Sequence, residues 1–138
     1  EVHQVGAWTL INDAYNASPS SMRASLETTA ALYPGRRVAV LGDMLELGTA
    51  AEKAHRDVGR RAAELGFAMV VTYGRQAQWT HEAAEAAGCP ACYHAVSHAD
   101  AAAYLRSHLM DGDTVLFKGS RGMRMEQIIA ALTGEGAH

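Results

Sequence analysis

Short apolar runs alternate with longer alanine-rich stretches along most of this chain, and this alternation is the feature that most restricts its fold. The apolar runs predict strands at residues 7–13, 37–42, 67–73, 92–96 and 114–118. Several runs are apolar at consecutive positions, as expected of strands that are covered on both faces. Strands that alternate with helices are typical of a parallel sheet with crossover helices.

Helix signals lie between these runs, and they predict helices at about 19–33, 50–65, 76–87, 98–110 and 122–133. Ser18 followed by Pro19 is typical of a helix start, because serine caps the first turn and proline lacks the N–H that would be unpaired there. Thr49 and Glu52 have the T-x-x-E spacing of a capping box. We therefore predict a three-layer, doubly wound, mostly parallel α/β sheet of the Rossmann-like class, with helices on both faces.

Composition indicates one globular domain over residues 1–138. The chain is 49% hydrophobic and 20% charged, with a formal net charge of −3 and no polybasic tract. Nucleic acid and anionic membranes are therefore poor candidates for partners. No apolar run is long enough to cross a bilayer, and "EVHQVGAWTL" lacks the pattern of a signal peptide. We expect a cytoplasmic setting.

Cys89 and Cys92 form one C-P-A-C pattern, which occurs both in redox pairs and in halves of zinc sites. Gly88 and Pro90 predict a turn here, whereas a reactive pair needs a helix start after the first cysteine. The seven histidines show no paired metal spacing. We interpret both thiols as incidental and predict no metal site.

Ligands of open parallel sheets bind outside the carboxyl ends of the strands. This rule selects three stretches, which we call loop 1 (residues 12–18), loop 2 (residues 42–48) and loop 3 (residues 118–122). In loop 1, Asp13 is suited to accept hydrogen bonds from ribose hydroxyls and Asn16 to donate to a phosphate. The residues alone equally allow a purely structural turn, in which Asp13 and Asn16 bond to the backbone.

Loops 2 and 3 carry the remaining charged candidates. Asp43 and Glu46 of loop 2 suit an amine or a magnesium ion, but a turn with surface charge also explains them. Loop 3, "KGSRG", combines Lys118, Ser120 and Arg121 with glycines that let backbone N–H groups approach an anion. Loop 3 therefore predicts a carboxylate or phosphate site.

Missing motifs narrow the function. The chain has neither G-x-x-x-x-G-K-[ST] nor G-x-G-x-x-G after its first strand. By itself it should therefore bind neither a triphosphate through a P-loop nor a dinucleotide through a Rossmann glycine motif. A phosphorylated receiver domain would use Asp13 and Lys118, but the third predicted strand ends in "VVTYGR" without an acceptor carboxylate. We therefore rank the receiver interpretation low.

Taken together and in order, three segments resemble the C-terminal domain of the Mur ligases. They are "DAYNASPSSMRASL", "VAVLGDMLELG" followed by His55, and "DTVLFKGSRGMRMEQII", within a similarity that covers about residues 8–132. The chain most resembles the branch that adds D-alanyl-D-alanine to UDP-N-acetylmuramoyl-tripeptide in bacterial peptidoglycan synthesis. The resemblance implies a three-domain enzyme whose UDP-sugar and P-loop ATPase domains are absent from this chain.

The implied reaction is ATP-dependent amide formation through an acyl phosphate. ATP and Mg²⁺ would be bound mainly by the middle domain, no catalytic residue is assigned to this domain, and the isolated domain should be inactive. By the same match, Asp13 would meet the ribose of ATP, and Tyr15 and Asn16 would lie near its base or phosphates. Ser18 stands where the family often has asparagine, so a ligand-binding side chain at that position is doubtful.

The resemblance also implies a dipeptide side. Lys118, Ser120 and Arg121 would hold the carboxylate of D-alanyl-D-alanine, and Asp43 and Glu46 would orient its ammonium group. Two alternatives stay open: a Mur ligase that adds a single amino acid, and a stand-alone binding module without catalysis.

Overall fold

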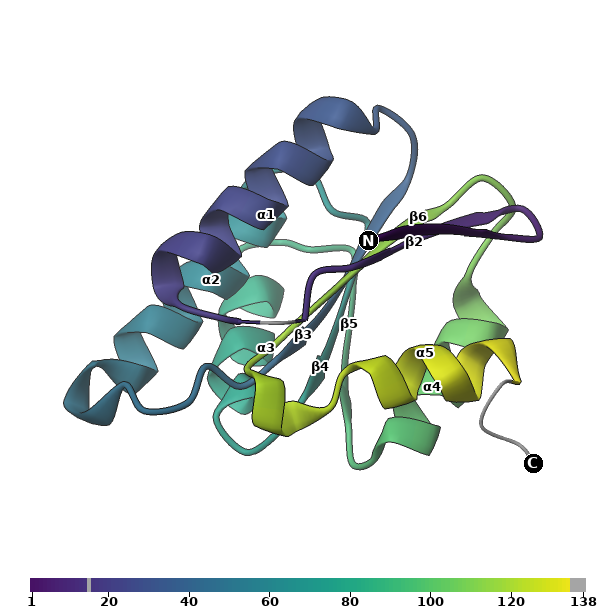
Figure 1. Cartoon of the computed structure of the whole chain (residues 1–138). Helices are drawn as coiled ribbons and strands as arrows, with labels where there is room; N and C mark the ends of the chain where they lie inside the picture. Colours follow the sequence, from purple (N-terminus) through teal and green to yellow (C-terminus); the bar gives the residue numbers. More distant parts are fainter. Residues whose placement is uncertain (15, 135–138) are drawn as a thin grey trace.

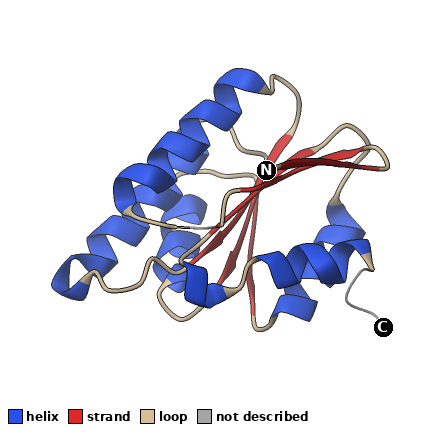
Figure 2. Ribbon diagram, in the orientation of Figure 1, coloured by secondary structure: helices blue, strands red, loops and turns tan. Residues whose placement is uncertain are grey.

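The computed structural model describes residues 1–14 and 16–134, and in these residues a six-stranded sheet lies between two layers of helices (Figures 1 and 2). The strands are β1 (Val2–Val5), β2 (Trp8–Asn12), β3 (Arg37–Gly42), β4 (Met69–Tyr73), β5 (Ala91–Ala95) and β6 (Thr114–Lys118). The helices are α1 (Pro19–Leu32), α2 (Ala51–Glu64), α3 (Ala77–Ala86), α4 (His98–His108) and α5 (Glu126–Thr133), with short 3-10 turns η1 (Gly48–Ala50) and η2 (Arg121–Met123).

The strand order is β1-β2-β6-β3-β4-β5, in which only the β1–β2 pair of the described strands is antiparallel. The predicted α/β sheet is confirmed, and the five predicted strands shift by at most two residues at their ends. The structure adds β1, which the sequence did not predict. β1 is an exposed edge strand, so it lacks the continuous apolar run by which the buried strands were found.

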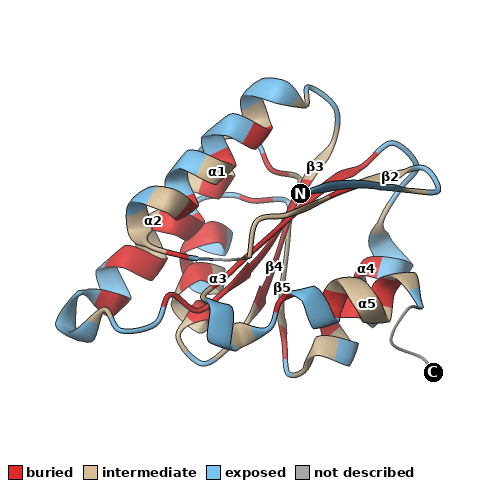
Figure 3. Cartoon of the chain, in the orientation of Figure 1, coloured by how far each residue is buried: buried red, intermediate tan, exposed pale blue. Residues whose placement is uncertain are grey.

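Each face of the sheet is covered by its own helices (Figure 1). α1, α2 and α3 cover one face, where Leu26 and Leu41 belong to one buried cluster. α4 and α5 cover the other face, where Phe117 and Ile128 belong to a second cluster. The central strands are buried along most of their length (Figure 3), as a doubly covered sheet requires.

The helix starts agree with the sequence in part. Ser18 caps α1 as predicted, and its side chain accepts a hydrogen bond from the backbone N–H of Ser21. The predicted capping box of Thr49 and Glu52 is wrong, because η1 precedes α2 and the cap residue Ala50 provides no side-chain hydrogen bond. The last predicted helix is interrupted, since Arg124 is left-handed (φ 51°) between η2 and α5.

The two cysteines are free thiols. Burial raises the pKa of the Cys92 thiol to about 12, so it stays protonated and unreactive at neutral pH. Within the described residues, no three or more His, Cys, Asp and Glu side chains are grouped so that they could hold a metal ion. None of the helices in the same residues is both long and apolar enough to cross a membrane.

Candidate functional site

The strand order brings the three loops to one edge of the sheet. β6 lies between β2 and β3, so loop 3 lies between loop 1 and loop 2. After β2 and β3 the chain enters helices on one face, and after β6 it enters α5 on the opposite face. Neighbouring strands whose connections diverge in this way open a crevice at their carboxyl ends, where ligands of doubly wound sheets bind.

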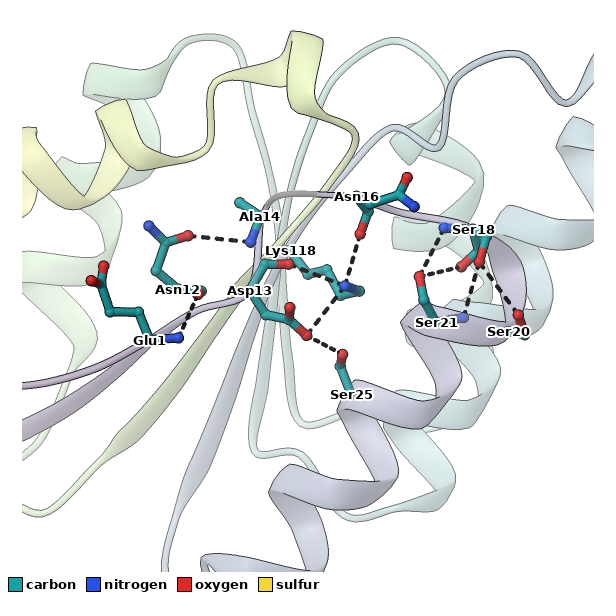
Figure 4. A network of polar contacts seen from close by, with 10 residues as sticks. All are labelled: Glu1, Asn12, Asp13, Ala14, Asn16, Ser18, Ser20, Ser21, Ser25 and Lys118. Carbon is teal, nitrogen blue, oxygen red and sulfur yellow. Dashed lines mark hydrogen bonds and ion pairs between the residues drawn. The ribbon is translucent and has the colours of Figure 1, made fainter.

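Lys118, at the end of β6, joins loop 3 to loop 1 (Figure 4). Its side chain is only 4% exposed. The ammonium group donates to the backbone carbonyls of Asp13 at 3.1 Å and Asn16 at 2.9 Å, and lies 3.2 Å from the Asp13 carboxylate oxygen Oδ2. Lys118 therefore binds loop 1 in this structure, and its charge is directed at the protein's own carbonyls.

Some polar side chains of loop 1 are hydrogen-bonded within the protein, and others are exposed to solvent. The Asn12 side chain accepts a hydrogen bond from the backbone N–H of Ala14 at 3.2 Å, and the Ser25 hydroxyl donates to Asp13. Asp13 nevertheless remains 45% exposed, so its carboxylate is available at the edge of the sheet. The Asn16 side chain is exposed and extends away from Lys118 (Figure 4). Tyr15, the other predicted nucleotide contact, lies outside the described residues.

Loops 2 and 3 are hydrogen-bonded to each other. The backbone N–H of Ser120 donates to the Asp43 carbonyl at 2.8 Å, and the Ser120 hydroxyl accepts from the backbone N–H of Leu45 at 2.8 Å. Their backbones also approach closely, because a Cβ at Gly119 would lie 3.0 Å from the Gly42 Cα. Ser120 thus fixes loop 2 against loop 3.

The two acidic residues of loop 2 are placed very differently. Asp43 is 5% exposed, and its carboxylate accepts a hydrogen bond from the backbone N–H of Ala77 at 2.7 Å, at the start of α3. Glu46 is exposed and adopts a left-handed backbone conformation (φ 64°). Asp43 is therefore occupied inside the protein, whereas the Glu46 carboxylate faces outward.

Glu46 lines an open pocket between loop 2 and the start of α3. The residues that line it are Glu46, Leu47, Gly48, Ala51, Arg75, Gln76, Gln78 and Trp79. Arg75 gives the pocket a cation besides the anion of Glu46, and the side-chain oxygen of Gln76 is buried without a hydrogen-bond partner. Such a pocket is suited to a small ligand that carries both an ammonium and a carboxylate group.

Sequence reasoning missed Arg75 and its neighbours. They follow β4 directly, so the rule that selected loops 1 to 3 also applied to "TYGRQ". Arg121 lines a second, separate hollow with Asn12, Ala14 and Glu126, beside loop 1. The structure therefore brings the three loops together but places Glu46 and Arg121 in different hollows.

The fold and these loops define a doubly wound α/β domain with a ligand-binding crevice at the carboxyl ends of its strands. Residues 1–121 match the family model described as Mur ligase, glutamate ligase domain. The chain belongs to this family, and the predicted Mur ligase resemblance is confirmed.

Two curated relatives are UDP-N-acetylmuramoyl-tripeptide--D-alanyl-D-alanine ligases. The protein from Bacillus subtilis is 37% identical over 126 residues, which are 90% of this chain and 28% of the relative. The protein from Escherichia coli is 36% identical over 132 residues, which are 92% of this chain and 27% of the relative. The chain thus spans little more than a quarter of the length of these relatives.

Solved structures of MurF ligases have the same fold. MurF from Acinetobacter baumannii superposes with a TM-score of 0.84 at 32% identity, over 97% of this chain and 30% of that one. MurF from Thermotoga maritima, solved in complex with ADP, superposes with a TM-score of 0.83 at 27% identity, again over 97% of this chain and 30% of that one.

Proposed function

We propose that this chain acts as the third domain of an ATP-dependent ligase that adds D-alanyl-D-alanine to UDP-N-acetylmuramoyl-tripeptide in the bacterial cytoplasm. The observation that carries the proposal is the family match over residues 1–121, which includes loops 1 and 2 and reaches into loop 3. The D-alanyl-D-alanine ligases among the relatives support this choice of added substrate. The UDP-sugar would be bound by the remainder of the enzyme.

Loop 1 forms the nucleotide side of the proposed site. The half-exposed Asp13 carboxylate accepts hydrogen bonds from the ribose hydroxyls of ATP, and the exposed Asn16 side chain binds its base or phosphates. Lys118 holds loop 1 in place for this contact rather than touching ATP. The ADP bound to the Thermotoga maritima relative supports nucleotide use. The described residues offer no acidic cluster for Mg²⁺, so we assign the metal to the rest of the enzyme.

Loop 2 and the start of α3 form the dipeptide side. Glu46 binds the ammonium group of D-alanyl-D-alanine, and Arg75 binds its carboxylate from the other wall of the same pocket. Arg121 is a second candidate for the carboxylate, on loop 3 between the two sides. Ser120 and Asp43 support this side by fixing loop 2 to loop 3 and to α3.

This arrangement gives the domain a positioning role in amide formation. ATP would supply the phosphoryl group that converts the tripeptide carboxylate into an acyl phosphate with release of ADP, and attack by the dipeptide amine would then release inorganic phosphate. Holding both ends of the dipeptide fixes the direction of that amine, and orientation of this kind accounts for a large part of enzymatic rate enhancement. Before the attack, the dipeptide ammonium group must lose one proton to the solvent, so that it leaves Glu46 as an uncharged, nucleophilic amine.

Steady-state kinetics of the full-length ligase test the proposal. Asp13→Ala should raise the KM for ATP about tenfold and leave that for the dipeptide within twofold, because a charged hydrogen bond is lost on one side only. Arg75→Ala and Glu46→Gln should raise the KM for the dipeptide about tenfold and leave that for ATP within twofold. Arg121→Ala in the same assay decides whether loop 3 also holds the carboxylate. If Asp13→Ala, Arg75→Ala and Glu46→Gln left both KM values unchanged in folded enzyme, the proposed assignment of the loops would fail.

A further inference from the structure

We propose that His55 is a positioning residue that holds loop 2 in its dipeptide-binding conformation; this inference rests on the proposed function. His55 lies on α2 and is completely buried. Its Nε2 atom lies 2.9 Å from the backbone nitrogen of Met44 in loop 2, and its Nδ1 atom lies 2.7 Å from the Ala51 carbonyl oxygen. The imidazole thus connects the first turn of α2 to loop 2.

The two partners determine where the proton of the ring lies. The Ala51 carbonyl only accepts hydrogen bonds, so Nδ1 must carry the proton and donate it. The backbone N–H of Met44 only donates, so Nε2 must accept. His55 is therefore the neutral Nδ1–H tautomer. A neutral histidine ring carries a donor and an acceptor on opposite nitrogens. An apolar side chain of the same size could therefore make neither of these two hydrogen bonds.

His55 completes a row of anchors that ends at Glu46. Asp43 is bound to the start of α3, Met44 to His55 and Leu45 to Ser120, in consecutive positions. Glu46 follows directly in a left-handed conformation, which a residue with a side chain keeps only where its surroundings impose it. Losing the Met44 anchor would let loop 2 populate conformations in which the Glu46 carboxylate is misplaced.

His55 also contacts the opposite wall of the pocket. Its ring centroid lies 6.1 Å from that of Trp79, which lines the pocket from α3. The His55 carbonyl accepts a hydrogen bond from the buried Thr80 hydroxyl at 3.0 Å. The same residue therefore touches both elements between which the dipeptide is proposed to bind. Thr80 offers a matched control, because its bond joins α2 to α3 without involving loop 2.

Three variants of the full-length ligase test the inference. His55→Leu fills the space but removes the acceptor, and should raise the dipeptide KM about tenfold while the ATP KM changes less than twofold. The reason is that apparent affinity falls with the fraction of enzyme in the competent conformation. His55→Gln can present an oxygen to the Met44 N–H and should recover most of the affinity. Thr80→Val should lower the melting temperature without changing either KM.

The outcomes separate the possible explanations. If His55→Leu and Thr80→Val raised the dipeptide KM equally, or if His55→Gln gave no recovery over His55→Leu, the role of His55 would be structural only and the inference would be overturned. If His55→Leu does not fold, the residual effect of His55→Gln decides: a dipeptide KM raised about threefold with an unchanged ATP KM supports positioning, whereas a dipeptide KM equal to that of Thr80→Val and wild type overturns it. Absence of dipeptide ligation by the wild-type enzyme would instead refute the proposed function.

Discussion

Lys118 shows at the scale of one residue how a buried charge organises the site. The residue is 3% exposed, and its ammonium group is shared between two backbone carbonyls and the Asp13 carboxylate. Lys118→Met should lower the free energy of unfolding by about 2 kcal/mol, because buried acceptors lose their donor. Urea denaturation measures this change. Lys53→Met is the control, since the Lys53–Asp57 ion pair is exposed and should contribute less than about 0.5 kcal/mol. Equal effects of the two variants would contradict the prediction.

His94 should make stability depend on pH. It bonds to the Thr72 hydroxyl at 2.7 Å, and burial, assisted by the nearby His81, lowers its pKa below the ordinary histidine value of 6.5, although Asp43 acts in the opposite direction. The unfolded chain then binds the proton more readily than the folded one. The contribution of His94 is therefore fully present above about pH 6.5 and is lost as the pH falls from there through the lower pKa of the folded state.

Urea midpoints between pH 7.5 and pH 5 measure this effect. His94→Gln should flatten the fall in stability towards pH 5. A slope that is the same in wild type and His94→Gln would show that another group titrates.

The positions of the loops at strand ends could be predicted from the sequence, but the hydrogen-bond partners of their side chains could not. Loop 1 was selected correctly as a strand end, but nothing in "KGSRG" indicates that Lys118 turns to the carbonyls of loop 1. Asp43 was read as a ligand-facing carboxylate, whereas it bonds to the start of α3. The partners of Lys118 and Asp43 depend on which strands are neighbours in the sheet. Strand order is set by contacts between segments that are far apart in the chain.

At the scale of elements, the packing of α2 on α3 depends on one glycine. A Cβ at Gly59 would lie 2.2 Å from the Thr80 carbonyl oxygen, far inside contact distance. Gly59→Ala should lower the free energy of unfolding by about 2 kcal/mol, although alanine is the better helix former by about 1 kcal/mol. Gly35→Ala is the control, because a Cβ there meets open space. Denaturant unfolding that finds Gly59→Ala as stable as Gly35→Ala would contradict the close packing.

The elements themselves were predictable because the central strands contain runs of consecutive apolar residues. β3 and β6 are buried along nearly their whole length, which is the property that the sequence pattern reports. The capping box of α2 was predicted wrongly because T-x-x-E is a local signal, and here η1 takes up the residues that would have formed the cap. Local patterns therefore predicted the elements and their approximate bounds better than the capping interactions.

At the scale of the molecule, the position of β6 was the missing information. The last strand in sequence lies at the centre of the sheet, between β2 and β3, and this insertion creates the crevice. Hydrophobic patterns carry no record of strand order, so they could not show that loop 3 lies between loops 1 and 2. The observed order places the proposed nucleotide side beyond β2 and the dipeptide side beyond β3 and β4, with loop 3 between them.

This division of the site predicts that the isolated chain neither hydrolyses ATP nor ligates D-alanyl-D-alanine. It carries no G-x-x-x-x-G-K-[ST] loop for the triphosphate, and its described residues hold no cluster of metal ligands. A reaction that needs a triphosphate-binding loop and a bound metal would require closure of this domain on the rest of the ligase. Phosphate release by the chain and by the full-length ligase, measured side by side, tests this expectation. A cooperative unfolding transition of the isolated chain serves as the control for folding, and ATP turnover by the folded chain alone would show that the proposed dependence on other domains is wrong.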